Sequence, residues 1–105
     1  MFYYGYISKF SQNYNKDIIN KYLNYSIENH LDIKKIFTES NNFSDDLFEQ
    51  CDFNSLINKR ELKNTTIIIN NCRDVASNLL ELSKIYILLS QLKIKIEIIE
   101  NNSSS

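Results

Sequence analysis

The sequence predicts an α/β fold in which helices flank a short parallel sheet. Three observations lead to this prediction. Four apolar segments have the length and composition of strands, segments of helical period lie between them, and the two kinds alternate along the chain. Such alternation favours parallel pairing, because each helix carries the chain back across the sheet. We therefore expect three layers, with a four-stranded, mainly parallel sheet between helices.

The first half of the chain contains a strand, a helix and a second strand. Residues 2–8 (FYYGYIS) are aromatic and β-branched around Gly5, which suits a buried strand lying close to another backbone. Apolar residues recur every three or four positions over residues 14–29 and predict a helix. Residues 32–39 (DIKKIFTE) are short and rich in strand formers, so the next strand is expected there.

The second half repeats this alternation twice. Ser44 is a candidate N-cap for a helix over residues 45–58, because two aspartates follow it in the first turn. Residues 65–71 (TTIIINN) form a continuous apolar run typical of a strand covered on both faces. Leucines and isoleucines at helical spacing predict a long helix over residues 76–92, whose leucine face from residue 79 to 92 is expected to be mostly core. Strict alternation over 93–99 predicts an edge strand.

Composition limits the classes of function. A chain of 105 residues has room for one domain, assigned to residues 1–100, with a polar, disordered tail at 101–105. The net charge of −1 does not favour nucleic acid or an anionic membrane. No segment approaches the roughly 18 apolar residues of a membrane span, so we expect a cytoplasmic protein.

The sequence predicts neither a metal site nor a cofactor site. Cys51 and Cys72 lie far apart without a metal-ligand spacing, and we expect two buried free thiols. His30 is the single histidine, which leaves little basis for a Ser-His-Asp arrangement. No glycine-rich phosphate loop follows the first strand, so flavin binding is not expected.

Ligands of parallel α/β sheets gather at the carboxyl ends of the strands. Here those ends fall at residues 8–11, 39–44 and 70–77, and they lie within the segments YGYISKFSQN, KIFTES and IIINNCRDVASNLLEL. These segments resemble the catalytic domain of the serine recombinases, the resolvase and invertase family. The resemblance covers nearly all of residues 1–100, through element order and spacing more than motif identity. It implies a flavodoxin-like, resolvase-like fold and a role in site-specific DNA recombination.

The resemblance does not place a nucleophile securely. In the register without gaps, the family's serine falls on Phe10 and its first arginine on Ser8. Deleting two residues places the nucleophile on Ser8, and a shift of one places it on Ser11. Phenylalanine cannot attack a phosphate, so Ser8 and Ser11 remain as weak candidates.

The arginines of the family are also largely missing. Its phosphate-binding arginines fall near Gln50 and on Asp74 and Ser77, and a shift of one residue recovers Arg73 alone. Arginine suits this role because its planar fork grips phosphate and stays charged. Each lost donor typically costs on the order of 10² to 10³ in rate. The resemblance therefore implies an impaired or inactive domain, and a truncated one, because the family continues into a long helix and a DNA-binding domain.

Two functions stay open. The first is a degenerate resolvase-type domain, with DNA, a second copy or a full-length recombinase as partner. The alternative is a stand-alone flavodoxin-like module that binds another protein and has no DNA role; Leu80, Ile87 and Leu88 widen the apolar stripe of the last helix beyond what one sheet face needs. Retained cleavage by Ser8 or Ser11 with Arg73 is a more distant third.

Overall fold

The computed structural model describes residues 2–9, 11, 17–39 and 46–100, and within them the predicted α/β class is confirmed. Five parallel strands form one sheet in the described part of the chain, one strand more than expected. The strands are β1 (Tyr3–Ile7), β2 (Ile33–Thr38), β3 (Phe48–Gln50), β4 (Thr66–Ile69) and β5 (Lys95–Ile98). The α-helices are α2 (Ile18–Glu28), α3 (Phe53–Ile57) and α4 (Leu79–Leu92), and two 3₁₀ turns lie at Arg60–Leu62 and Cys72–Asp74.

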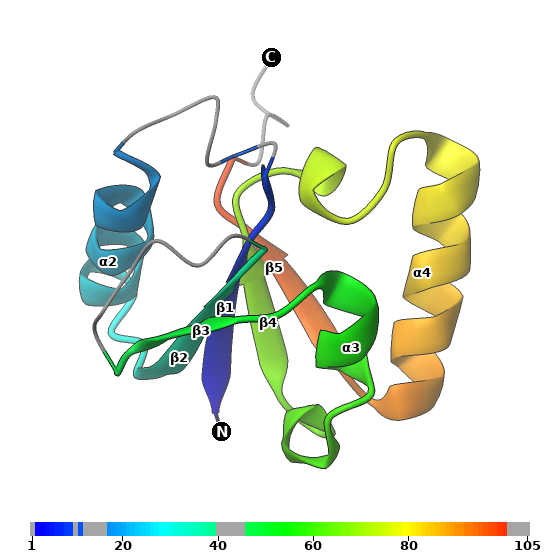
Figure 1. Cartoon of the computed structure of the whole chain (residues 1–105), viewed down its shortest axis with the longest axis horizontal. Helices are drawn as coiled ribbons and strands as arrows, with labels where there is room; N and C mark the ends of the chain where they lie inside the picture. The colour runs from blue at the N-terminus through cyan, green and yellow to red at the C-terminus, as the bar shows by residue number, and fades with distance from the viewer. Residues whose placement is uncertain (1, 10, 12–16, 40–45, 101–105) are drawn as a thin grey trace.

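The strand order is β3-β2-β1-β4-β5, with β1 at the centre (Figure 1). Without the three-residue β3, the order β2-β1-β4-β5 matches the first four strands of a flavodoxin-like sheet. Strands β2 and β3 lie on one side of β1, and β4 and β5 lie on the other side. The strand order therefore reverses between β1 and β4. In open α/β sheets this switch point, at the carboxyl ends of the strands, is where ligands bind.

Helices cover both faces of the sheet, which makes three layers (Figure 1). On one face, Ile18 and Tyr22 of α2 are buried against the sheet. On the other face, α3 and the turn after it contribute most of the buried helical side chains, whereas α4, all of which the structure describes, has one buried residue, Leu89. The sheet residues in these two cores are Ile7, Ile36 and Ile68 on the first face and Tyr6, Phe37, Ile67 and Ile69 on the second.

The expected helix over residues 45–58 is wrong in its first half. Phe48–Gln50 forms the edge strand β3, with Phe48 beside Ile36 of β2. The helix that follows starts at Phe53, and the side chain of Asp52 accepts a hydrogen bond from the Ser55 N–H at its N-terminus. The packing of the partly buried Phe48 against the sheet outweighs the local N-cap signal. Ser44 itself lies outside the described residues.

Smaller differences concern the last helix and the cysteines. The helix begins at Leu79 rather than residue 76, because Asn78 caps it by accepting from the Glu81 N–H at 2.9 Å. Cys51 and Cys72 are free, as expected, but half-buried rather than buried. In the described part of the chain, no helix combines the length and the apolar character needed to cross a bilayer.

Candidate functional site

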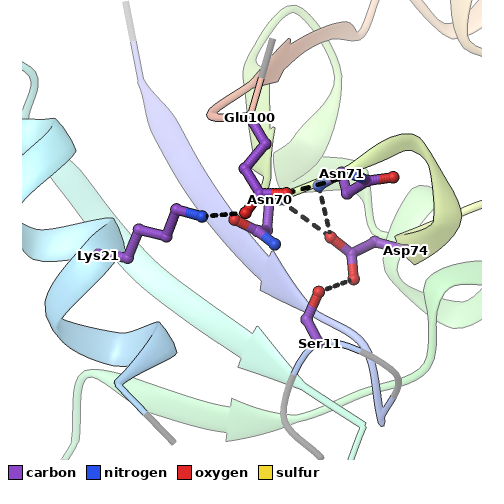
Figure 2. Close-up of polar contacts among 6 residues, drawn as sticks. All are labelled: Ser11, Lys21, Asn70, Asn71, Asp74 and Glu100. Carbon is purple, nitrogen blue, oxygen red and sulfur yellow. Dashed lines mark hydrogen bonds and ion pairs between the residues drawn. The ribbon is translucent and has the colours of Figure 1, made fainter. Parts of the chain in front are cut away.

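The candidate site lies at the switch point, where Ser8 follows β1 and Asn70 and Asn71 follow β4. A 3₁₀ turn, Cys72–Asp74, then leads toward α4. Its last residue, Asp74, points back at the end of β1 (Figure 2). Residues that are more than sixty positions apart in sequence therefore meet at one point on the edge of the sheet.

The carboxylate of Asp74 accepts four hydrogen bonds. The hydroxyls of Ser8 and Ser11 both donate to Oδ1. The backbone N–H groups of Asn70 and Asn71 donate to Oδ2, each at 3.0 Å (Figure 2). Four donors are about what the lone pairs of one carboxylate can accept, so these residues fully occupy it.

Local sequence explains how Asp74 reaches this position. Asn71 and Asp74 form a capping box around the 3₁₀ turn: the Asn71 side chain accepts from the Arg73 N–H at 3.0 Å, and the Asp74 side chain accepts from the Asn71 N–H. The carboxylate that caps the turn is thus the one that holds the two serines. On the β1 side, the Ser11 N–H donates to the Ser8 hydroxyl at 3.3 Å.

All three side chains are buried. The exposed fractions are 3% for Ser8, 2% for Ser11 and 6% for Asp74. A buried charge is tolerated only where hydrogen bonds replace its hydration, and here four donors do so. Neither serine hydroxyl is accessible to a DNA phosphate, so this geometry favours a structural polar cluster over a nucleophile.

The negative charge of Asp74 helps to raise the pKa values of two buried tyrosines, Tyr6 and Tyr22. The Tyr22 hydroxyl donates to the carbonyl of Tyr6. Burial raises the pKa of Tyr22 well above its ordinary value, and the charge of Asp74 adds to the effect. Burial likewise raises the pKa of Tyr6, with smaller contributions from the charges of Glu39 and Asp74. Both phenols therefore stay protonated and neutral.

An ion pair borders the cluster. Lys21 of α2 pairs with Glu100, which follows β5, and Glu100 also accepts from the Asn71 amide at 3.4 Å (Figure 2). The hydrogen bond from Lys21 lowers the pKa of Glu100. Beside them, the side-chain carbonyl of Asn70 is buried and accepts no hydrogen bond from the described residues. The polar groups at the switch point thus mostly bind one another.

The remaining predicted residues lie elsewhere or outside the described chain. Arg73 and Ser77 are exposed and line a hollow of about 300 Å³ beside the start of α4, which Ser8 and Ser11 do not line. Gln50 is exposed at the end of β3, where its amide donates to the Glu39 carbonyl at 3.3 Å. Phe10 lies outside the described residues. Arg73 thus lines this hollow, whereas the hydroxyls of Ser8 and Ser11 bind the carboxylate of the next residue, Asp74.

From the sequence, Ser8 and Ser11 were candidate site residues and Asp74 fell on an arginine position, but the binding of these three side chains to one another was not predicted. Asn70 and Asn71 fall in the segment expected at this edge but were given no role, and Lys21 and Glu100 were not predicted to belong to the site. An asparagine three residues before an aspartate, directly after a buried strand, is a capping-box signal that could have identified the turn. The pairing with two serines depends on which strands are neighbours, and no local pattern reports that.

A second surface stands out on α4. Five large apolar side chains project from it into solvent; we call them the α4 outer face. Residue 79 was expected to face the core, and the structure corrects this. The exposed fractions are 81% for Leu79, 67% for Leu80, 43% for Tyr86, 62% for Ile87 and 40% for Leu88.

Neither surface has the features of a metal centre: the described residues contain no group of three His, Cys, Asp or Glu side chains that could hold an ion. Comparison with known proteins found no matching family model, no matching curated protein and no matching solved structure. The switch point and the α4 outer face are therefore the two features of the molecule that bear on its function.

Proposed function

We propose that this chain is a non-catalytic protein-binding domain of resolvase-like architecture, and that the α4 outer face is its binding surface. The observation that carries the proposal is the exposure of five large apolar side chains on one helix. That helix has a single buried residue, Leu89. A helix that packs only onto its own sheet should bury most of its apolar side chains.

The exposed side chains of the α4 outer face carry a free-energy cost of hydration. Burying apolar surface contributes about 25 cal/mol per Å², so side chains of this size left in solvent forgo several kcal/mol in total. Monomeric proteins rarely expose contiguous apolar patches larger than a few hundred Å², and larger ones mark interaction sites. A partner that covers the α4 outer face would recover this free energy.

The switch point supports the non-catalytic part of the proposal. Phosphoryl transfer requires a nucleophile and preorganised cations at the same phosphate. Ser8 and Ser11 instead donate to a buried carboxylate, and the exposed Arg73 lines a hollow that the two serines do not line. Asp74 would also repel a phosphate that approached the serines.

Kinship with the serine recombinases remains part of the proposal, as an account of ancestry. It adds a second candidate function, weak DNA contact, which the exposure of Arg73 at the carboxyl edge of the sheet favours. Salt-dependent DNA binding that is lost in Arg73→Ala but kept in Arg60→Ala, an exposed arginine beyond α3, would support DNA contact. If the chain does not bind DNA at moderate salt, protein binding is the remaining candidate function.

The main experiment is site-specific photo-crosslinking in cells that make the protein. A crosslinking side chain replaces Ile87 on the α4 outer face, and a matched control replaces Asn24, an exposed residue of α2 on the opposite side of the sheet. We expect discrete adducts from position 87 that are absent from position 24. Equal adduct patterns at the two positions would contradict the proposed binding surface.

Catalysis is tested directly with supercoiled DNA. We expect no nicking by the purified chain, because neither candidate serine is accessible. Nicking that Ser8→Ala or Ser11→Ala abolishes would overturn the non-catalytic assignment, whatever the crosslinking result.

A further inference from the structure

We infer that the outer edge of β5 pairs in antiparallel fashion with the same edge of a second copy of this chain, about a two-fold axis at Ile96. The pairing would join the two sheets into one. The edge of β5 is a different surface from the α4 outer face, so the inference goes beyond the proposed function and does not depend on it.

The edge of β5 is open. Strand β5 is the last strand of the sheet, and among the described residues no strand pairs with its outer side. In a flavodoxin-like sheet, one more strand lies beside the position that β5 occupies here. An edge strand presents unpaired backbone N–H and C=O groups, to which a strand of another molecule can bond. The outer edge of β5 can therefore accept a further strand.

The hydrogen bonds on the inner side of β5 identify the backbone groups that point outward. The N–H groups of Lys95 and Ile99 donate to carbonyls of the β4 segment (residues 65–69), at 3.0 and 2.8 Å. Backbone groups alternate in direction along a strand, so the odd-numbered residues face β4, whereas Ile96 and Ile98 face outward. These two isoleucines therefore carry the backbone groups that can bond an added strand.

The charged side chains of β5 lie together on one face of the sheet. The isoleucines of this segment pack against the core on the other face: Ile94, Ile96 and Ile98. Glu97 lies on the face of α2, where it accepts from the Tyr25 hydroxyl at 3.2 Å. Lys95, two residues away, is on the same face. It is exposed and forms no ion pair with the residues that the structure describes.

One two-fold register brings these charges together. With the axis at Ile96, the two Ile96 residues exchange backbone hydrogen bonds, as their outward direction requires. Lys95 of each copy then lies directly opposite Glu97 of the other, at a position without backbone bonds, where facing Cβ atoms are about 4.5–5.5 Å apart. The like charges lie on the diagonals, which are longer, at about 7–8 Å. The contact therefore contains two attractive pairs.

The neighbouring registers lack this complementarity. An axis at Lys95 or at Glu97 would place two like charges directly opposite each other, which is destabilising. An axis at Ile98 would place Glu97 opposite the apolar Ile99. The register about Ile96 is also self-complementary, as an isologous interface requires. Charge thus favours a second copy as the partner and fixes how the two strands align.

The length of the strand limits the affinity. Strand β5 has four residues and is about 13 Å long, so the contact buries less than the roughly 1,600 Å² of a standard interface. We expect a reversible dimer with a dissociation constant of about 100 µM.

The experiment is sedimentation equilibrium of the full chain from about 10 µM to about 1 mM. The wild type is expected to shift from 12.4 kDa toward twice that mass. Lys95→Glu alone and Glu97→Lys alone each make both charge pairs repulsive, and each should weaken association about tenfold. An equimolar mixture of the two variants pairs unlike charges again, so it should associate at least as tightly as the wild type.

Two control variants match the charge reversals. Lys63→Glu changes the net charge as Lys95→Glu does, at an exposed site between Leu62 and β4. Tyr25→Phe removes the hydrogen bond to Glu97 that Glu97→Lys also loses, without changing a charge. Both controls should leave association unchanged. If Glu97→Lys does not fold, Lys95→Glu with Lys63→Glu as its control still tests the charge pairing.

Amide hydrogen exchange tests the backbone pairing itself. The Ile96 N–H faces outward, so its exchange should be several times slower at about 1 mM protein than at about 50 µM. The Lys95 N–H is already bonded to the Thr65 carbonyl and is the internal reference, whose exchange should change less. Exchange of the Ile96 N–H that does not depend on concentration would contradict the pairing.

The other failures are distinguishable. A wild type that stays at 12.4 kDa up to about 1 mM overturns the inference. Association that neither charge reversal weakens would come from another surface and also overturns it. Association that the mixture fails to restore overturns the register about Ile96. The proposed function is tested separately, by crosslinking from position 87.

Discussion

The hydroxyl of Ser11 donates a hydrogen bond to the carboxylate of Asp74, 63 residues further along the chain. Together with the matching bond from Ser8, it ties the end of β1 to the turn after β4, across the point where the strand order reverses. In many α/β proteins this point receives a ligand. In this chain the carboxylate of Asp74 lies at that point and connects the ends of β1 and β4 through hydrogen bonds. The edge that usually binds a ligand therefore has a structural role here.

Replacement of Asp74 by Asn should destabilise the fold. The amide oxygen can keep the two backbone N–H bonds, but its NH₂ group then faces the hydroxyls of Ser8 and Ser11, whose protons lose the acceptor that the carboxylate now provides. A buried donor without a partner costs about 1–3 kcal/mol, and removing the buried charge offsets part of this. We expect the free energy of unfolding in urea to fall by about 2 kcal/mol.

The matched control for that change is Asp32→Asn. Asp32 has an 80% exposed side chain and pairs with Lys34 on the surface, so its loss should cost less than about 0.5 kcal/mol. Similar small losses in both variants would show that the four hydrogen bonds of Asp74 contribute little to stability.

The two serines should matter for stability rather than for chemistry. Ser11→Ala leaves three donors on Asp74 and should lower the free energy of unfolding by about 1 kcal/mol, with a similar loss for Ser8→Ala. Ser83→Ala, at an exposed α4 hydroxyl that donates to the Leu79 carbonyl, should change it by less than about 0.5 kcal/mol. A neutral effect at both buried serines would contradict a stabilising role for their hydrogen bonds to Asp74.

Most of the fold could be predicted because its long elements have strong periodic patterns. Residues 65–71 form an uninterrupted apolar run, and the corresponding strand β4 is buried at every position. Strand β3 could not be predicted in this way, since three residues show no period and only their pairing with residues 36–38 of β2 makes them a strand. Its identity is decided by tertiary contact, which outweighs the helix signal before it.

The site was less predictable than the fold. The carboxyl ends of β1 and β4 were expected to meet, and they do. The groups that bind one another at this edge could not be predicted, because the contacts join side chains that are far apart in sequence. A resemblance-based register places Asp74 where a phosphate-binding arginine would be, and so suggests repulsion of a ligand. The structure instead pairs it with Ser8 and Ser11, a relation that depends on three-dimensional position alone.

The buried tyrosines predict a loss of stability at high pH. Tyr6 and Tyr22 have raised pKa values in the folded state, whereas the unfolded chain releases these protons near pH 10. Above about pH 10 the folded state therefore holds more protons than the unfolded state, and the free energy of unfolding must fall as the pH rises. Below that pH these two groups make no pH-dependent contribution.

Urea unfolding at several pH values, with tyrosinate absorbance recorded in parallel, checks this expectation. Tyr22→Phe should flatten part of the decline while lowering stability by about 1 kcal/mol at neutral pH, because the hydrogen bond to the Tyr6 carbonyl is lost. Ionisation of all seven tyrosines in the folded protein near pH 10 would contradict the burial of these phenols.

Gly5 at the centre of the sheet should not tolerate a side chain. A Cβ atom placed there would lie 3.1 Å from Cγ1 of Ile36 and 3.2 Å from Cδ2 of Tyr22. Both of these side chains are fully buried, so neither can move aside without disturbing the core. We expect Gly5→Ala to lower the free energy of unfolding by about 1–3 kcal/mol, through overpacking rather than backbone conformation.

A double-mutant cycle with Ile36→Ala identifies the cause of that loss. If the clash with Ile36 dominates, Gly5→Ala should cost at least about 1 kcal/mol less in the Ile36→Ala background than in the wild type, because the new methyl group then fills part of a cavity. Additive effects would mean that the two positions do not interact. The loss would then have to come from Tyr22, and the same cycle with Tyr22→Ala would locate it.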